Sequence, residues 1–221
     1  MTENHSYSHA SLPAAHRSGY VGKSRPGVQT KLSAEGEVLV KSPTTMMGYF
    51  KAPQLTAEVI TQDGFLRTGD RGEIDENGLL RITGRVKDLF KTAKGKYVSP
   101  ALIESLLMRS PLLEQACVCG LGYPQPFALA TLAEGMRARI GDPAVRGSVE
   151  AALAEVVRQA NAGLEAHERL QYLTIVSGDW QVENGMVTPT MKVKRAAIEK
   201  HYGQCFQPWF DKGRPVVWES A

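Results

Sequence analysis

The first part of the chain is a series of short apolar runs separated by turn residues. Between positions 28 and 85 the runs VQTKL, EVLVK and LLRITGR alternate with segments such as AEG and DENG. This pattern is typical of strands joined by tight turns, because glycine, asparagine and aspartate supply the backbone conformations that reversing turns need. We predict a hairpin-rich β region that resembles a small open barrel, with one or two helical turns around positions 55–60.

After position 87 the pattern changes to alternating helices and strands. Helices are expected to begin at Ser99-Pro100 and at Asp142-Pro143, because a capping side chain followed by proline favours a first helical turn and the cap contributes about 1 kcal/mol. The apolar stripes expected on these two helices are Leu102, Ile103, Leu106 and Leu107, and Val149, Leu153, Val156, Val157, Ala160 and Leu164. QACVCGL, FALATLA and YLTIV are predicted strands, and AAIEKHY is a predicted last helix.

The predicted fold class is therefore α+β. A small β-barrel-like subdomain is expected over residues 1–86, and an α+β domain over residues 87–221. The aromatic tail QCFQPWFDKGRPVVWES is expected to dock against this second domain.

Composition and charge exclude several classes of protein. The 221 residues are 43% hydrophobic and 22% charged, as in ordinary globular proteins. A net charge of +3 is too small to indicate nucleic-acid binding by itself. No apolar run approaches the about 18 residues that span a bilayer, and the polar start MTENHSYSHAS lacks the apolar stretch of a signal peptide. We expect a cytoplasmic protein with no transmembrane segment and no nucleic-acid partner.

The cysteines and the first histidines do not indicate a resident metal. Cys117 and Cys119 lie in QACVCGL, which is typical of a buried strand, and the odd count of three fits a reducing compartment. A metal site would need more soft ligands at loop spacings. His5 and His9 stand four apart near the start, where a mobile end is the simpler interpretation than a metal pair.

The stretch GRVKDLFKTAKGKYVSP, residues 84–100, carries five basic residues and one acid. Together with LRTGD (66–70) and TPTMKVKR (188–195), it resembles the nucleotide-binding, hinge and catalytic-lysine motifs of the adenylate-forming (AMP-binding) acyl-CoA synthetases. The stretch GEVLVKSPTTMMGYFKAPQLTAEVI (36–60) is similar to a further pattern of that family. The form TPTMKVKR looks most like the long-chain fatty acid-CoA ligase branch.

The resemblance implies nucleotide contacts in the first part of the chain. Asp70 would accept hydrogen bonds from two adjacent ribose hydroxyls, although a TGD turn in which the aspartate caps its own backbone is the alternative. Arg85 would add a contact to the ribose or phosphate, or pair with Asp88 or Glu73. Thr2 and Glu3 match family residues that contact the AMP phosphate and the magnesium ion.

The resemblance also implies a hinge and a coenzyme A channel. Lys87 stands where the family has its hinge residue, whose backbone turns when the last domain rotates; an ordinary exposed linker lysine is the alternative. Residues 94–97, which are Lys94, Gly95, Lys96 and Tyr97, match the loop that borders the pantetheine channel. Their charge, rather than the resemblance, suggests that the two lysines attract the phosphates of coenzyme A; solvated lysines are the alternative.

Lys192 is the predicted catalytic residue. A carboxylate that attacks the α-phosphate of ATP builds negative charge on the phosphoryl oxygens, and a positioned ammonium group stabilises that charge most in the transition state. The alternative is a surface cluster of Lys192, Lys194 and Arg195 that binds no phosphate.

The family's phosphate loop and acid-binding pocket, both in a large N-terminal domain, are not in this sequence. We therefore expect the C-terminal fragment of an ATP-dependent acyl-CoA synthetase, in which Met1 matches an internal methionine. Its substrates would be a carboxylic or fatty acid, ATP with Mg²⁺, and coenzyme A, and its partner would be the missing N-terminal adenylation domain. We expect no adenylation by the chain alone.

Two other functions remain open. One is a non-catalytic nucleotide- or coenzyme A-binding or regulatory module, and the other is a fragment of an aryl- or amino-acid-activating adenylation enzyme.

Overall fold

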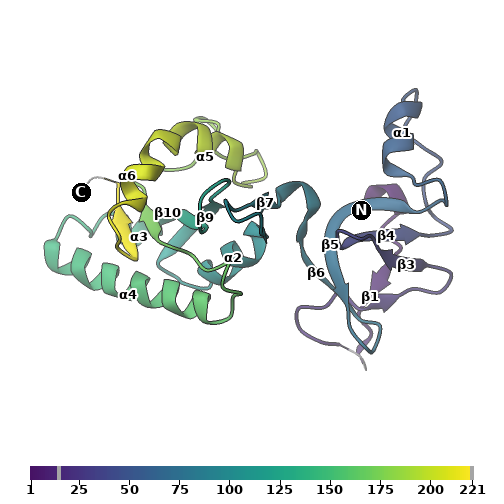
Figure 1. The fold of residues 1–221 in the computed structure, drawn as a ribbon, viewed down its shortest axis with the longest axis horizontal. Helices are drawn as coiled ribbons and strands as arrows, with labels where there is room; N and C mark the ends of the chain where they lie inside the picture. The colour runs from purple at the N-terminus through teal and green to yellow at the C-terminus, as the bar shows by residue number, and fades with distance from the viewer. Residues whose placement is uncertain (14–15, 220–221) are drawn as a thin grey trace. The chain divides into compact units, whose positions relative to one another are not determined.

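The computed structural model describes residues 1–13 and 16–219, which form two compact units (Figure 1). The first unit is Met1–Asp88, and the second begins at Leu89 and contains the rest of the described chain. Within the described part, no helix combines the length and the apolar character that crossing a membrane requires.

The first unit is built on an open antiparallel sheet. Its order is β3 (Gln29–Leu32), β4 (Glu37–Lys41), β5 (Leu66–Ile74) and β6 (Leu80–Arg85), and a separate pair is formed by β1 (His9–Ala10) and β2 (Lys23–Ser24). The helices are η1 (Thr2–Asn4) and α1 (Pro53–Val59), and η3 (Val86–Asp88) ends the unit. The predicted β region and its short helix are confirmed, and the strands described here form no closed barrel.

The turn between β5 and β6 follows from the DENG sequence. Asp75 accepts hydrogen bonds through Oδ1 from the backbone N–H groups of Asn77 and Leu79, at 3.0 and 2.9 Å. Gly78 has φ +75°, a left-handed conformation that glycine adopts at little cost. Leu80, Val38 and Val40 then meet in a small buried core on one face of the sheet.

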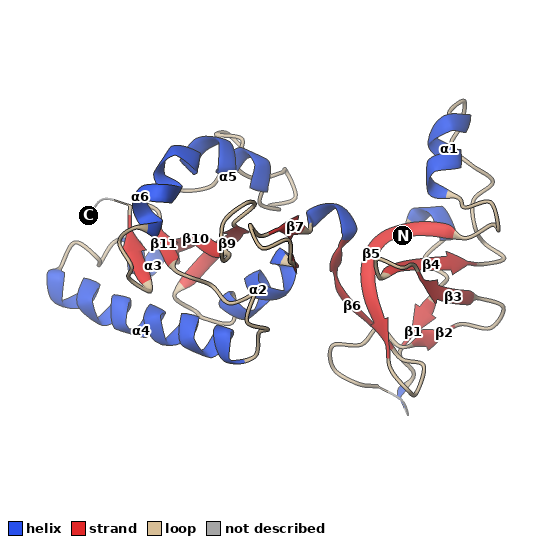
Figure 2. Cartoon of the chain, in the orientation of Figure 1, coloured by secondary structure: helices blue, strands red, loops and turns tan. Residues whose placement is uncertain are grey.

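The second unit contains a mixed four-stranded sheet between two layers of helices (Figure 2). The strand order is β12 (Val216–Trp218), β11 (Leu173–Ile175), β10 (Phe127–Leu132) and β9 (Leu113–Cys119); β9 is antiparallel to β10, and the other pairs are parallel. The helices are α2 (Pro100–Leu107), α3 (Glu134–Arg137), α4 (Pro143–Ala162), α5 (Arg195–Tyr202), η4 (Gly203–Cys205) and α6 (Phe206–Phe210). A short hairpin, β7 (Phe90–Lys91) and β8 (Tyr97–Val98), precedes α2.

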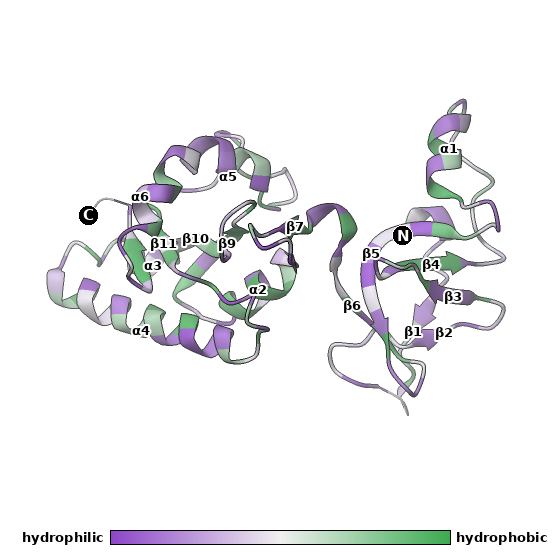
Figure 3. Cartoon of the chain, viewed as in Figure 1, coloured by the Kyte–Doolittle hydropathy of each residue, from purple (hydrophilic) through white to green (hydrophobic). Residues whose placement is uncertain are grey.

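The two faces of the sheet bury different cores. Side chains on one strand alternate between faces, so Val118 joins the core under α2 and α4, while Cys117 and Cys119 join the core under α5 and α6. Figure 3 shows hydrophobic and hydrophilic residues interleaved along α4, whose apolar stripe, including Leu153, is buried. The prediction that both cysteines lie in a buried strand is confirmed.

The predicted helix starts are correct, with two differences in detail. Asp142 caps α4 by accepting a hydrogen bond from Ala144 N at 2.8 Å. Ser99 stands at the N-cap of α2, but its side chain makes no capping hydrogen bond. The prediction that this cap stabilises α2 is therefore wrong. Leu102, predicted in the apolar stripe, is 43% exposed, because the core lies under Ile103 and Leu107.

The aromatic tail docks as predicted and also extends the sheet. Trp209 of α6 is buried against the second core, and Val216–Trp218 pairs in parallel with β11 as the last strand. Trp218 is held by a hydrogen bond from Nε1 to Glu150 of α4, at 2.8 Å. This strand was not predicted from the sequence.

Candidate functional site

A bulge in β5 carries the predicted ribose-binding aspartate. Glu37 pairs with Arg71 and Leu39 with Arg67, so β5 covers four residue steps where β4 covers two. Residues 68–70 thus lie opposite Val38 alone, which makes two extra residues on β5, and they have no directly paired residue on β4. Gly69 has φ +71°, which explains why a glycine stands at the centre of the bulge.

Asp70 forms an ion pair with Arg85 on the neighbouring strand. The two residues are directly paired in the β5–β6 register, and Arg85 Nε lies 3.0 Å from Asp70 Oδ1. Their side chains are 33% and 60% exposed for Asp70 and Arg85, so both remain accessible to a ligand. The alternative of an Arg85–Glu73 pair is wrong, since Glu73 pairs with Arg81 at 2.6 Å.

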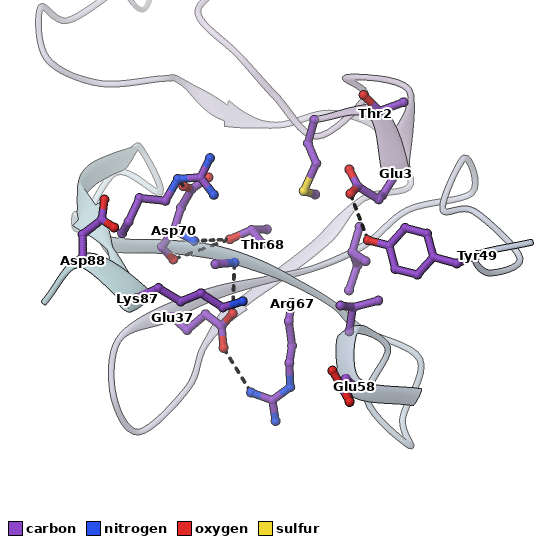
Figure 4. A pocket seen from close by; sticks show the side chains of 15 residues that line it. Thr2, Glu3, Glu37, Tyr49, Glu58, Arg67, Thr68, Asp70, Lys87 and Asp88 are labelled. Carbon is purple, nitrogen blue, oxygen red and sulfur yellow. Dashed lines mark hydrogen bonds and ion pairs between the residues drawn. The ribbon is translucent and has the colours of Figure 1, made fainter. Parts of the chain in front are cut away.

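The five predicted site residues of the first unit line a single cavity of about 780 Å³ (Figure 4). They are Thr2 and Glu3 from η1, Asp70 from β5, Arg85 from β6 and Lys87 from η3. Glu37, Tyr49, Glu58 and Arg67 also line this cavity and were not predicted. The G-E pair at 36–37 was part of a recognised motif, but its chemistry could not be assigned without the fold.

Glu3 is oriented by a tyrosine from the loop before α1. Tyr49 donates its hydroxyl hydrogen to Glu3 Oε1 at 3.1 Å, and this bond raises the pKa of Tyr49 because it stabilises the neutral phenol. The described residues include no group of three or more His, Cys, Asp or Glu side chains placed to hold a metal ion. A single carboxylate such as that of Glu3 suits Mg²⁺ that is coordinated mainly by water and nucleotide phosphates.

His9, which stands four residues after His5, has two hydroxyl groups beside its ring. Its Nε2 lies 3.2 Å from Ser24 Oγ and 3.3 Å from Thr30 Oγ1. Burial lowers the pKa of His9, since the charged ring would lose hydration. His9 lies in β1 and pairs with Ser24, so the expectation of a mobile end is wrong at this residue.

In the second unit Lys192 lies on an exposed turn closed by Thr188. The two residues exchange hydrogen bonds: Thr188 N donates to Lys192 O at 2.8 Å, and Lys192 N donates to Thr188 Oγ1 at 3.1 Å. Met191 has φ +61°, and Val187 bridges Val193 on the other side of the turn. The chain around Lys192 is therefore fixed while its side chain stays exposed.

Arg195, part of the alternative surface cluster, is instead half-buried and structural. Its Nε donates to Val118 O at 2.9 Å, and its Nη2 donates to Glu104 Oε1 at 2.7 Å. Glu104 also accepts from Val118 N at 2.9 Å, so α2, β9 and α5 are joined at one point. The alternative prediction, an exposed cluster of Lys192, Lys194 and Arg195, is therefore wrong for Arg195.

The loop predicted to border the coenzyme A channel turns at Gly95, which has φ +73°. Lys94, Lys96 and Tyr97 are exposed, and Lys91 Nζ lies 4.8 Å from the centroid of the Tyr97 ring. Tyr97 O lies 3.1 Å from His167 Nε2, which must carry the proton because a carbonyl only accepts.

Residues 87–212 match the family model for the C-terminal domain of AMP-binding enzymes. The chain is 36% identical over 206 residues to the long-chain-fatty-acid–CoA ligase FadD15 of Mycobacterium tuberculosis, covering 88% of this chain and 34% of the relative. It is 33% identical to long-chain-fatty-acid–CoA ligase 1 of Homo sapiens, covering 86% and 31%. The chain thus spans about a third of the length of these curated relatives.

Solved structures agree with this assignment. Apo MatB from Rhodopseudomonas palustris is 26% identical with a TM-score of 0.65, covering 93% of this chain and 40% of that one. The adenylation domain of a carboxylate reductase from Mycobacterium chelonae has a TM-score of 0.70 at 23% identity, covering 89% and 34%, and supports the fold alone. The chain therefore belongs to the AMP-binding enzymes and carries their C-terminal domain.

Proposed function

We propose that this chain is the C-terminal part of an ATP-dependent acyl-CoA synthetase of the fatty-acid type. The observation that carries the proposal is the cavity where Asp70, Arg85 and Lys87 lie with Thr2 and Glu3. The residues up to position 86 would be the last β subdomain of a large adenylation domain, and the following domain would be its mobile lid. The rest of the adenylation domain would be its partner.

In the first reaction the carboxylate of the acid attacks the α-phosphorus of ATP, and pyrophosphate leaves. Asp70 would accept hydrogen bonds from the ribose hydroxyls, and the Arg85 guanidinium beside it would contact the ribose or phosphate. Lys192 would donate to the phosphoryl oxygens as their negative charge grows. Glu3 would take part in holding the Mg²⁺ that accompanies the nucleotide.

In the second reaction the thiol sulfur of coenzyme A attacks the acyl carbonyl, and AMP leaves. Rotation of the lid about Lys87 would withdraw Lys192 and bring residues 94–97 to the thiol. Lys87 is exposed and lies one residue before the division between the two compact units, which supports a hinge at this position. The exposed ammonium groups of Lys94 and Lys96 suit the phosphates of coenzyme A.

The nucleotide site is tested by binding to the chain itself. AMP and 2′,3′-dideoxy-AMP differ only in the ribose hydroxyls, so their dissociation constants isolate the contact assigned to Asp70. We expect AMP to bind about tenfold more tightly, and Asp70→Asn to remove most of this preference. Asp63→Asn is the matched control, because Asp63 pairs with Lys31 and does not line the cavity. Equal binding of the two nucleotides to the wild-type chain would refute the assignment.

The catalytic role is tested in a chimera that joins the part of FadD15 before the matched region to this chain. Pyrophosphate release with ATP, Mg²⁺ and a fatty acid should fall by about two to three powers of ten in Lys192→Ala. Lys200→Ala, an exposed lysine of α5, should leave the rate unchanged. The chain alone should release no pyrophosphate. A chimera that binds AMP without any turnover would favour the non-catalytic module.

A further inference from the structure

We propose that Glu37 is a positioning residue that holds the bulge of β5 so that Asp70 faces the nucleotide ribose. The inference rests on the proposed function and extends it to the motif GEVLVK, to which that function assigns no role. The hydrogen bonds described for the Glu37 carboxylate come from Gly69 and Arg67, and none comes from Asp70. Its action is on the backbone that carries Asp70.

The bulge needs another partner on the β4 side because its residues are not paired with β4. Residues 68–70 have no directly paired residue on β4. Leu39 pairs with Arg67, and Glu37, two residues away on β4, already pairs with Arg71. Gly69 N, which a regular strand would direct to a neighbouring carbonyl, donates instead to Glu37 Oε1 at 3.0 Å. A side chain therefore replaces the ladder bond at the centre of the bulge.

Further contacts join the same piece of β4 to the bulge. Glu37 Oε2 accepts from Arg67 Nη1 at 3.1 Å, just before the bulge. Thr68 donates through Oγ1 to Val38 O at 2.7 Å, and its Oγ1 accepts from Asp70 N at 3.1 Å. The bulge is thus fixed on both sides of Gly69, and Glu37 supplies the bond in the middle, as Figure 4 shows.

The burial of Glu37 supports its role in holding the bulge. The residue is only 8% exposed, although a carboxylate in this position costs free energy unless hydrogen bonds compensate for lost water. The hydrogen bonds described for its two oxygens go to Gly69 and Arg67, which lie in and beside the bulge. An apolar side chain would pack there without desolvation cost but would leave Gly69 N without this acceptor.

The consequence concerns ligand geometry. Asp70 is one residue after Gly69, and a binding group must be held within about 0.5 Å of its productive position to be effective. Without Glu37 the bulge has no acceptor at its centre, and the Asp70 carboxylate would be less well placed for two ribose hydroxyls. The predicted effect is a loss of ribose recognition that exceeds any loss of folding.

The test compares the AMP to 2′,3′-dideoxy-AMP affinity ratio in three variants of the whole chain. Glu37→Ala should lower the ratio at least fivefold, whereas Glu37→Gln, whose amide oxygen still accepts from Gly69 N, should stay within about twofold of wild type. Glu73→Ala is the control, since Glu73 is an exposed carboxylate of β5 paired with Arg81. Hydrogen exchange of the Gly69 amide, measured by NMR without nucleotide, should accelerate in Glu37→Ala only.

The outcomes separate this inference from the proposed function. A wild-type chain that does not distinguish the two nucleotides would overturn both. If wild type distinguishes them and Glu37→Ala does so equally well, the inference alone fails. If Glu37→Ala does not fold, Glu37→Asp takes its place. Aspartate keeps the charge but is one methylene too short to accept the hydrogen bond from Gly69 N. An unchanged AMP to 2′,3′-dideoxy-AMP affinity ratio in Glu37→Asp would refute the proposal.

Discussion

The join between α2, β9 and α5 should be a main source of stability in the second unit. Arg195 is the first residue of α5 and lies three residues after Lys192. Its guanidinium group donates to Val118 O and to Glu104 Oε1, and both ionic side chains are 22% exposed. Arg195→Ala removes both bonds and leaves Glu104 with only the Val118 N–H as the donor described here.

The expected cost follows from this burial. Removing one partner of a buried ion pair costs about 3–5 kcal/mol, because the remaining charge loses its compensation. Since both side chains retain some contact with water, we expect the lower end, about 3 kcal/mol. A loss of this size should lower the melting temperature of the second unit by roughly 10 °C.

Tryptophan fluorescence isolates the relevant unit. The chain has three tryptophans, Trp180, Trp209 and Trp218, and all are buried in the second unit. Urea and thermal unfolding followed at these residues therefore report on that unit. Arg158→Ala is the matched control, because Arg158 pairs with Glu155 on the surface of α4 and is 70% exposed. The control should change the unfolding midpoint little.

A double-mutant cycle completes the experiment. Arg195→Ala combined with Glu104→Gln should be less destabilising than the sum of the single changes, because the second change removes the uncompensated charge. If Arg195→Ala is no more destabilising than Arg158→Ala, or if the two changes are additive, the structural role derived for Arg195 is refuted.

Three further predictions concern other parts of the chain. Gly69→Ala should lower the free energy of unfolding by about 1–2 kcal/mol, because alanine is strained at φ +71°, and should weaken AMP binding. Gly78→Ala is the control, because Gly78 has φ +75° but does not line the cavity; it should lower the free energy of unfolding by a similar amount in NMR-monitored unfolding and leave AMP binding unchanged. Leu153→Ala, which empties a fully buried site under α4, should cost about 2–5 kcal/mol by tryptophan fluorescence, and a cost below 1 kcal/mol would contradict the packing described here. Because burial lowers the pKa of His9 in the folded state, the unfolded chain binds a proton more readily than the folded chain; the stability of the first unit should be complete above about pH 6.5 and fall as the pH drops below that value, and His9→Gln should reduce this fall in NMR-monitored unfolding.

The sequence by itself determined the main elements of both units and the family, but not the last strand, β12. The DENG turn, the Asp142 cap and the apolar periodicity of α4 depend on neighbours within a few residues, so their chemistry can be recognised in the linear chain. The motifs at 66–70, 84–100 and 188–195 indicated an AMP-binding enzyme for the same reason.

Only the tertiary structure decided which residues support the site. Glu37 and Gly69 are 32 positions apart, and Glu104 and Arg195 are 91 apart. No local pattern encodes these contacts, because they depend on strand register and on how helices pack on the sheet. The same is true of Leu102, which has the helical spacing of a core residue but lies outside the core because α2 turns Ile103 and Leu107 inward. Periodicity identifies the face of a helix, and the packed neighbours decide where that face ends.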